Sequence, residues 1–353
     1  IPINMGVGYW RSASLIKQII ERSKTRRSYP GKLMGLAGYG TVKEKMLPHL
    51  RQFFTTRDGK IADMIYDGCF YGGNGGRNFA ATIQKTLEDL LFKELDKYDT
   101  QIPLVVTGGC ALNVIINEKI KDRYKREVYV PPNPNDGGLS LGHMFCYQKP
   151  IERVDVRYNG LPLLDKDELS GYNVKKVTKK EIAELIKDGK IVGLVYGDSE
   201  VGPRALGNRS IVCDPSIVDM KDILNSKVKH RESYRPFAPF CKKEDAHKYF
   251  ESRDFENMEC MSFAVRVKVD TLPSITHIDN TARLQTVTKE SHSHFYELLT
   301  EFGKISDTNV LLNTSFNTRG KPILSTISDA VDILNTTELD HVIVNDYLII
   351  NNL

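Results

Sequence analysis

The sequence lacks long apolar runs, paired cysteines and a strong net charge, and each absence narrows the class of protein. No apolar stretch approaches the ~18 residues that a membrane-spanning helix needs, and we expect no secretory signal peptide. The six cysteines are scattered and none forms a Cys-x-x-Cys pair, which argues against a cysteine zinc site and for a reduced, cytoplasmic chain. A net charge of +4 is too small to indicate nucleic-acid binding by itself.

The composition is that of an ordinary globular protein, with 41% apolar and 27% charged residues among 353. That length favours two domains. Predicted strands alternate with predicted helices in both halves, which indicates an α/β or α+β fold. Residues 151–175 contain glycine and proline but no sustained periodicity, so they resemble a linker. We therefore predict one domain over residues 1–150 and a second over residues 176–353.

A glycine-rich loop over residues 197–210 is the most informative stretch. It follows an apolar run, residues 191–196, that predicts a buried strand. Glycines let backbone N–H groups approach a ligand, and the planar guanidinium of arginine matches a carboxylate or phosphate. The loop carries Glu200, Arg204 and Arg209, so it is a candidate anion site. The alternative is an irregular surface loop whose arginines pair with nearby acids.

Two further turns in the first half follow short predicted strands. Gly108 and Gly109 come directly after a strand at residues 102–106, and a helix follows Asn113. A strand, a glycine turn and a helix together aim free N–H groups at a phosphate or nucleoside, although a tight turn alone has the same pattern. Asp136 and Gly137 open another helix after a strand at residues 128–130. Asp136 either caps that helix or holds a metal ion beside nucleotide phosphates.

Three other segments complete the pattern. Four glycines within residues 31–40 predict a loop, in contrast to the helix expected from Asn78 to Leu95. Residues 225–239 are basic and end in two prolines, which favours an ordered loop over a solvated face. Residues 309–312 predict a buried strand that runs into the polar residues 313–317.

These motifs together resemble the ATP-dependent O-carbamoyltransferases, which include nodulation-factor and antibiotic-tailoring enzymes. Residues 202–210, 225–239, 277–287 and 313–317 resemble the family's C-terminal, YrdC-like domain. Residues 31–40, 107–113 and 131–142 resemble the later part of its N-terminal domain. That domain has the actin/hexokinase-type (ASKHA) fold that is shared with the tRNA threonylcarbamoyl transferase. The resemblance covers nearly the whole chain, in order.

The resemblance implies carbamoyl transfer from carbamoyl phosphate, through a carbamoyl adenylate formed from ATP, to the hydroxyl of a small molecule. Fixed cations suit the anionic substrates, and paired donors and acceptors suit the carbamoyl amide. The implied catalytic residues are Arg204, Arg209, Lys229, Arg231 and Arg235. The implied substrate-binding residues are Asn208, Ser210, Lys227, His277, Asp279, Thr281, Arg283, Asn313, Ser315 and Asn317. The implied nucleotide-binding residues are Lys32, Gly108, Gly109, Asn113 and Gly137, with Asp136 at the metal.

Some of these roles have structural alternatives. Lys229 and Arg231 are surface charges in the other interpretation, and His277 is either an acid/base or a structural residue at a turn. Asn208 and Ser210 are either ligands or residues that only stabilise the loop. No residue is an obvious nucleophile, which fits direct attack by the acceptor on a mixed anhydride.

The chain departs from the family at its front. The family's N-terminal domain begins with an Asp-rich hairpin and a His-x-x-x-His metal motif, and neither is in this sequence. We therefore expect a family member that lacks the front of that domain, with Asp136 as the one visible ligand for iron or magnesium. A homodimer, or a partner chain that supplies the missing portion, is consistent with this. Two alternatives are a tRNA threonylcarbamoyl-type modification protein and a module that binds nucleotide or carbamoyl phosphate without turnover.

Overall fold

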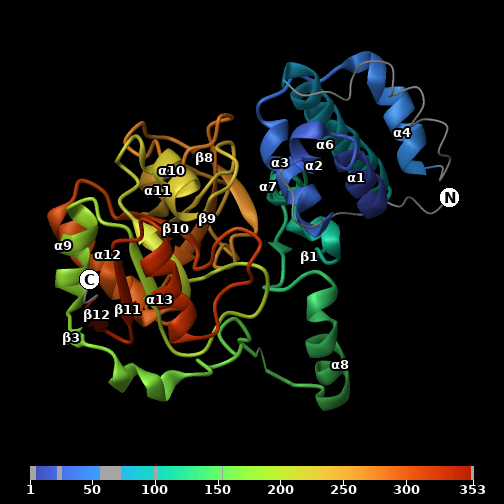
Figure 1. Cartoon of the computed structure of the whole chain (residues 1–353). Helices are drawn as coiled ribbons and strands as arrows, with labels where there is room; N and C mark the ends of the chain where they lie inside the picture. Colours follow the sequence, from blue (N-terminus) through green and yellow to red (C-terminus); the bar gives the residue numbers. More distant parts are fainter. Residues whose placement is uncertain (1–4, 22–25, 56–72, 99–101, 153, 351–353) are drawn as a thin grey trace.

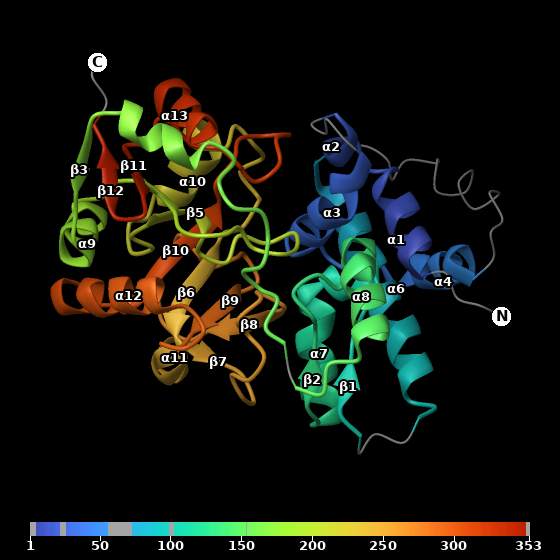
Figure 2. The same cartoon turned by 90° about the horizontal axis from the view of Figure 1, so that it is seen from below.

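The computed structural model describes residues 5–21, 26–55, 73–98, 102–152 and 154–350. We call residues 5–152 the N-terminal half and residues 154–350 the C-terminal half. The two halves lie side by side in both views of the molecule (Figures 1 and 2). None of the helices in the described part of the chain has the length and apolarity that crossing a membrane requires.

Helices make up most of the N-terminal half. Its two short strands pair in parallel, Leu104 with Val128 and Val105 with Tyr129. α8 projects from the rest of this half (Figure 1), and none of its residues is buried. The elements are α1 (Met5–Ala13), α2 (Lys17–Ile20), α3 (Tyr29–Ala37), α4 (Leu47–Thr55), α6 (Gly73–Leu95), β1 (Leu104–Val105), α7 (Val114–Tyr124), β2 (Val128–Tyr129) and α8 (Leu139–Gln148).

The loop predicted for residues 31–40 is wrong over most of its length, because α3 runs to Ala37 and only the following residues form a turn. Pro30 lies in the first turn of α3, where a proline costs no hydrogen bond. Leu33 and Leu36 are buried, and α3 packs against α6. This burial outweighs the poor helix propensity of the glycines. The helix predicted from Asn78 is confirmed, and it begins earlier, at Gly73.

One mixed sheet of ten strands forms the centre of the C-terminal half. The strand order is β3-β12-β11-β4-β5-β10-β6-β9-β8-β7; β4 with β11 and β6 with β9 are parallel pairs, and the other neighbours are antiparallel. The strands are β3 (Val174–Lys176), β4 (Val192–Val195), β5 (Arg209–Cys213), β6 (Ala238–Lys242), β7 (Phe250–Glu251), β8 (Phe263–Val267), β9 (Thr281–Val287), β10 (Val310–Ser315), β11 (His341–Val344) and β12 (Tyr347–Ile349). The predicted mixture of strands and helices is thus confirmed, as a mixed α/β structure.

Helices cover this sheet on both faces. α9 and α12 share an apolar core with Leu194 and Phe240, whereas α13 joins the larger core that includes Val195 and Cys213. The predicted last strand over residues 341–350 is instead a hairpin, because Asn345 and Asp346 take positive φ values of 47° and 68° between β11 and β12. The helices are α9 (Lys179–Lys187), α10 (Met220–Ile223), α11 (Ala246–Tyr249), α12 (Ser293–Ile305) and α13 (Ile327–Thr336).

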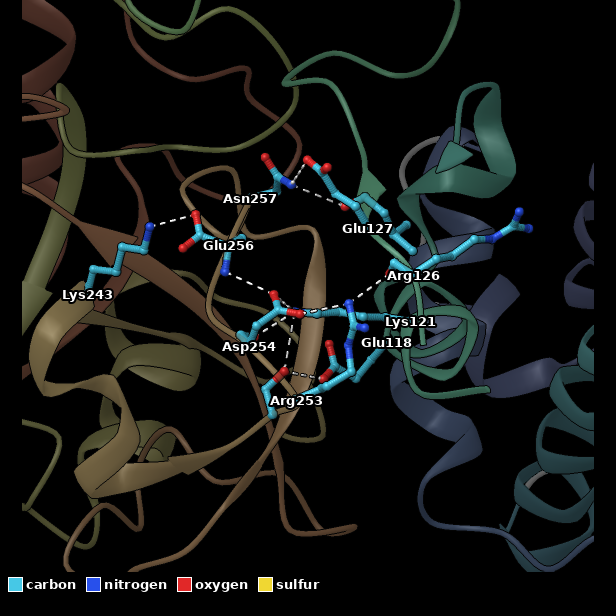
Figure 3. Close-up of polar contacts among 11 residues, drawn as sticks. Glu118, Lys121, Arg126, Glu127, Lys243, Arg253, Asp254, Glu256 and Asn257 are labelled. Carbon is cyan, nitrogen blue, oxygen red and sulfur yellow. Dashed lines mark hydrogen bonds and ion pairs between the residues drawn. The ribbon is translucent and has the colours of Figure 1, made fainter. Parts of the chain in front are cut away.

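The two halves are joined along α7, which packs against β8. Lys121 is buried, and its Nζ lies 2.6 Å from the Asp254 carbonyl oxygen and 2.9 Å from the Asp254 carboxylate. Its ammonium also lies 5.0 Å from the centre of the Phe263 ring. Asn117 donates from Nδ2 to the carbonyl oxygens of Ala111 and Ser262, at 2.8 Å each. Figure 3 shows the charged part of this joint, where α7 faces the segment around Asp254.

Candidate functional site

A cavity of about 790 Å³ lies between the two halves, and both contribute to its walls. The C-terminal wall comes from the β4–β5 loop, the segment before β6, and the ends of β9 and β10. The N-terminal wall comes from α1, α3 and the turns after β1 and β2. The sequence-predicted residues that line it are Gly109, Asn113, Asp136, Arg204, Arg231, Arg235, His277, Asp279, Thr281, Arg283, Asn313 and Ser315. Those that do not are Lys32, Gly108, Gly137, Asn208, Arg209, Ser210, Lys227, Lys229 and Asn317.

Four guanidinium groups, Arg204, Arg231, Arg235 and Arg283, face the cavity from three separate segments of the C-terminal half. No salt bridge in the described residues involves any of the four. Burial, and then repulsion from Arg235, lowers the pKa of Arg204 to about 10. Burial and the other three arginines lower the pKa of Arg283 well below its usual range. Glu232 partly offsets the charge of Arg231 and Arg235. A cluster of like charges without salt bridges is costly, and a bound polyanion would reduce that cost.

Hydrogen bonds fix Arg231 within this cluster. Its Nε donates to Asn225 Oδ1 at 2.7 Å, and its guanidinium lies 4.6 Å from the centre of the Phe237 ring. Burial, with repulsion from Arg235, lowers its pKa well below the usual range. The basic segment over residues 225–239 is therefore an ordered part of the cavity wall, and Arg231 is not a solvated surface charge.

Arg204 and Arg209, which sequence reasoning grouped together, have different surroundings. Arg209 is fully buried inside the β4–β5 loop, outside the cavity lining. Its guanidinium donates to the carbonyl oxygens of Tyr196 (2.7 Å), Asn208 (2.8 Å) and Gly197 (2.9 Å). These bonds occupy it with the backbone of its own loop. Arg204 lines the cavity, so the structure leaves one of the two guanidiniums free to meet a ligand.

Two buried polar side chains lie beside the arginines: Asn313 lines the cavity and Lys229 does not. Asn313 Nδ2 donates to the Ala205 carbonyl oxygen at 2.9 Å, while its buried Oδ1 has no partner in the described residues. Lys229 is buried and donates to the carbonyl oxygens of Ser315 (2.5 Å) and Asn317 (2.7 Å). Burial, with the nearby arginines, lowers the Lys229 pKa well below its usual range. Lys229 therefore stabilises the loop after β10 from a position outside the cavity lining.

Three other predicted ligands lie outside the cavity lining. Asn208 donates to the Asp198 carbonyl oxygen at 2.6 Å and its Oδ1 lies 2.8 Å from His292 Nε2, so both ends of its amide are occupied. Ser210 is buried on β5. Lys227 is exposed and pairs with Glu338 at 2.8 Å.

His277 forms a contact between the two halves. It is buried, and its Nε2 lies 3.1 Å from the Gly35 carbonyl oxygen in α3, so this nitrogen carries the proton. Burial lowers the His277 pKa below its usual value. Its buried Nδ1 has no partner in the described residues. Asp279 Oδ1 accepts from the N–H and hydroxyl of Thr281, at 3.1 and 2.7 Å, which closes the turn before β9.

The N-terminal wall offers open backbone and apolar surface. Gly108 has a φ of +86°, which favours glycine, and an added side chain at Gly108 or Gly109 would meet no atom within 4 Å. Asn113 caps α7 by accepting from the Ile116 N–H at 3.2 Å and is held by Gln84 at 2.9 Å. Tyr9, Trp10, Met34 and Leu112 of this half also line the cavity. Met34 and Leu112 lie within the motif segments 31–40 and 107–113, whereas no motif in the sequence marks Tyr9 and Trp10.

Lys32 belongs to the contact between the halves and not to the cavity lining. It is buried in α3 and forms a 2.5 Å salt bridge with buried Glu232 of the C-terminal half. The bridge lies in the same segment as Arg231 and Arg235. It therefore connects α3 to the segment that carries two of the four guanidiniums.

The described residues do not form a metal site. Asp136 is exposed at the start of a short 3-10 turn, where Asn135 caps the Gly137 N–H at 2.9 Å. No group of three or more histidine, cysteine, aspartate or glutamate side chains in the described residues is arranged to hold a metal ion. A lone carboxylate is too few ligands for a tightly bound cation.

Comparisons with known proteins identify a family. The family description "Carbamoyltransferase C-terminus" matches residues 183–351, and "Carbamoyltransferase N-terminus" matches residues 60–144. Nodulation protein NolO of Bradyrhizobium diazoefficiens is 36% identical over 297 residues, which cover 77% of this chain and 54% of NolO. The 3'-hydroxymethylcephem-O-carbamoyltransferase of Streptomyces clavuligerus is 30% identical over 350 residues, which cover 92% of this chain and 65% of that protein.

A third relative, nodulation protein NolNO of Sinorhizobium fredii, is 37% identical and is covered over 44% of its length. The chain thus spans about half the length of the curated relatives it matches. A structure of full-length HypF in its phosphate- and nucleotide-bound form aligns at 17% identity with a TM-score of 0.34. The match covers 47% of this chain and 21% of HypF, and we draw no conclusion about this chain from it. On the two family matches and these relatives, the chain belongs to the carbamoyltransferase family.

Proposed function

We propose that this chain carries the carbamoyl-activating site of an ATP-dependent O-carbamoyltransferase whose acceptor is the hydroxyl of a small molecule. In this proposal the C-terminal half is the YrdC-like unit and the N-terminal half is part of an actin/hexokinase-type unit. The observation that carries it is the set of four guanidiniums that form no salt bridge within the described residues, at a cavity that both halves line. The family membership supplies the carbamoyl chemistry.

The proposed reaction has an activation step, which comprises two reactions, and a transfer step. Water removes the phosphoryl group of carbamoyl phosphate as inorganic phosphate, and the resulting carbamate oxygen attacks the α-phosphorus of ATP. Pyrophosphate leaves and carbamoyl adenylate forms. The acceptor hydroxyl then attacks the carbamoyl carbon, loses its proton, and AMP departs. These steps need no nucleophile from the protein.

The arginine cluster suits the first step. Carbamoyl phosphate and the ATP phosphates bring several negative charges together. The four guanidiniums lie on one wall of the cavity, and Arg204, Arg231 and Arg283 are desolvated there. Preorganised charges stabilise developing negative charge without reorganisation during the reaction. Burial, and after it repulsion between neighbouring arginines, lowers the pKa of Arg204, Arg231 and Arg283. A bound anion would offset both effects, which supports this assignment.

The polar groups around Asn313 suit the carbamoyl amide. Its unpartnered Oδ1 is a buried acceptor that the carbamoyl NH₂ group would satisfy. Ser315 adds a hydroxyl at the same edge of the cavity. On the opposite wall we assign the nucleotide to the open backbone around Gly109, which lies before the N-terminus of α7. Asp279 and Thr281 complete the lining between these two regions.

ATP is a substrate in this proposal, and the role of a divalent metal stays a prediction. Asp136 is the carboxylate on the cavity wall nearest in sequence to the glycine turns. Because the described residues supply too few ligands, we assign no step to a metal.

The test is pyrophosphate release from ATP with and without carbamoyl phosphate, in the wild-type chain and in Arg204→Ala. We expect release that depends on carbamoyl phosphate and falls by about 10²-fold or more in the variant, because one preorganised donor to developing charge is worth that much. Release that ignores carbamoyl phosphate would contradict the proposal. Carbamoyl phosphate binding without any release would instead support a binding module.

A further inference from the structure

Glu200 lies inside the β4–β5 loop and has no role in the site described so far. Its side chain is buried, 8% exposed. Oε1 accepts three backbone N–H groups, from Leu206 and Asn208 at 2.7 Å each and from Arg209 at 3.1 Å. Oε2 is buried and has no partner in the described residues. One carboxylate oxygen therefore holds the part of the loop from Leu206 to Arg209, where the chain enters β5.

The three N–H groups belong to the stretch that directly follows Arg204. Within it, Gly207 has a φ of +131°, and the loop also contains Gly202 with a φ of +117°. Neither glycine favours one conformation by itself. The conformation of this stretch therefore depends on hydrogen bonds to other residues, and Glu200 accepts three of them.

No hydrogen bond or salt bridge in the described residues holds the Arg204 guanidinium, which lines the cavity. Its direction is set by the backbone that carries it. Besides Glu200, Asn313 anchors this backbone by donating to the Ala205 carbonyl oxygen at 2.9 Å. Losing the Glu200 bonds would leave three N–H groups to find new acceptors, and the backbone under Arg204 would move.

We propose that Glu200 is a positioning residue, which holds the β4–β5 loop so that Arg204 points into the anion site. The identity of that anion as carbamoyl phosphate or ATP rests on the proposed function, whereas the positioning itself does not. Burial raises the pKa of Glu200 and lowers the pKa of Arg209, and the Glu200 charge partly opposes the fall at Arg209. Glutamine keeps the oxygen that accepts the three N–H groups, whereas aspartate, one methylene shorter, does not place it there.

The experiment titrates the full chain with inorganic pyrophosphate by calorimetry and compares Glu200→Gln with Glu200→Asp. Asp198→Asn is the matched control, because Asp198 is an exposed carboxylate on the same loop. We expect Glu200→Gln and the control to bind within about threefold of wild type, and Glu200→Asp to bind at least about tenfold more weakly. Hydrogen exchange without ligand should quicken at the Leu206 and Asn208 amides in Glu200→Asp alone.

A double-mutant cycle separates positioning from a general role in folding. If Glu200 acts through Arg204, Glu200→Asp weakens pyrophosphate binding in the wild-type background and changes it less than about twofold in the Arg204→Ala background. Equal losses in both backgrounds overturn the proposal. So does a Glu200→Gln variant as weak as Glu200→Asp, or the failure of both variants to fold.

The same titrations distinguish failure of the proposed function. A wild-type chain that binds pyrophosphate but releases none from ATP and carbamoyl phosphate contradicts the proposed function, and the cycle still decides the role of Glu200. A wild-type chain that does not bind pyrophosphate overturns both.

Discussion

The two walls of the cavity are built in opposite ways. The C-terminal wall carries four guanidiniums and a buried amide on segments anchored to a ten-stranded sheet. The N-terminal wall consists of helices and turns with glycines and apolar side chains, such as Gly31 and Met34. The guanidiniums lie on segments that the sheet holds in place despite their mutual repulsion. The N-terminal wall leaves room for a ligand. In the proposed reaction the first wall activates the carbamoyl group, and the second receives the bulky nucleotide and acceptor.

Arg283→Ala tests the charged wall and carries the largest expected effect. We expect kcat/KM for carbamoyl phosphate to fall by about 10²- to 10³-fold, as for the loss of one preorganised donor. The ligand-free variant should also be more stable than wild type, by about 1 kcal/mol, because it removes one of four like charges. Pyrophosphate release and urea unfolding measure the two effects.

Arg266→Ala is the matched control, because Arg266 is exposed on the neighbouring strand β8 and lies 3.9 Å from Glu251. We expect wild-type activity and stability from it. An Arg283→Ala variant that loses stability along with activity would show that this arginine supports the fold, and the contrast between the walls would then be mistaken.

Gly31→Leu tests the open wall. A side chain added at Gly31 meets no atom within 4 Å, and this position in α3 lines the cavity, so leucine would occupy ligand space with little strain on the fold. We expect the Kd for ATP to rise by about tenfold, as for a lost buried contact, and the Kd for carbamoyl phosphate to stay within about twofold. Calorimetric titration of each ligand measures both.

Gly142→Leu is the control for this change, since Gly142 in α8 also has open space around it and does not line the cavity. It should bind both ligands as wild type does. Equal losses for ATP and carbamoyl phosphate in Gly31→Leu would mean that the two ligands do not divide between the walls.

The charged wall was easier to predict from sequence than the open wall. Glycine and arginine within residues 197–210 indicate an anion site by residue type alone, and Arg204 does line the cavity. The same pattern could not separate Arg204 from Arg209, because the Arg209 guanidinium is held by the carbonyl oxygens of Tyr196, Asn208 and Gly197, and sequence alone does not show these bonds. Tyr9 and Trp10 gave no signal, since an apolar residue that lines a cavity has the same sequence pattern as one in a core.

The helix α3 shows the other limit of sequence reasoning. Its glycines predicted a loop, yet Leu33 and Leu36 pack into the core and stabilise a helix there. Glycine at position 31 then keeps the cavity open. Local propensity and tertiary burial conflict at this wall, whereas they agree on the sheet of the C-terminal half, and the fold of that half was predicted more closely.

Glu118→Gln tests the joint that holds the two walls together, and it is expected to change stability without changing activity. Glu118 is buried on α7, and its Oε1 accepts from Ser252 Oγ of the C-terminal half at 2.7 Å. Burial raises its pKa to about 7; Lys121 opposes the rise, and Asp122 and Asp254 add to it. The folded state therefore binds the proton more tightly than the unfolded state, whose pKa is near the ordinary value of 4.5.

With this sign, the Glu118 contribution is most favourable below the unfolded pKa and is lost as the pH rises from 4.5 to about 7. Glutamine stays neutral, so at pH 8 we expect the free energy of unfolding of Glu118→Gln, measured with urea, to be about 1 to 3 kcal/mol higher than that of wild type. This difference should narrow at pH 5. Glu297→Gln, an exposed carboxylate on α12, should show neither effect. If the gap between Glu118→Gln and wild type is the same at both pH values, the carboxylate does not titrate in this window, and the joint is held by Lys121 and Asn117 without a pH-dependent cost at Glu118.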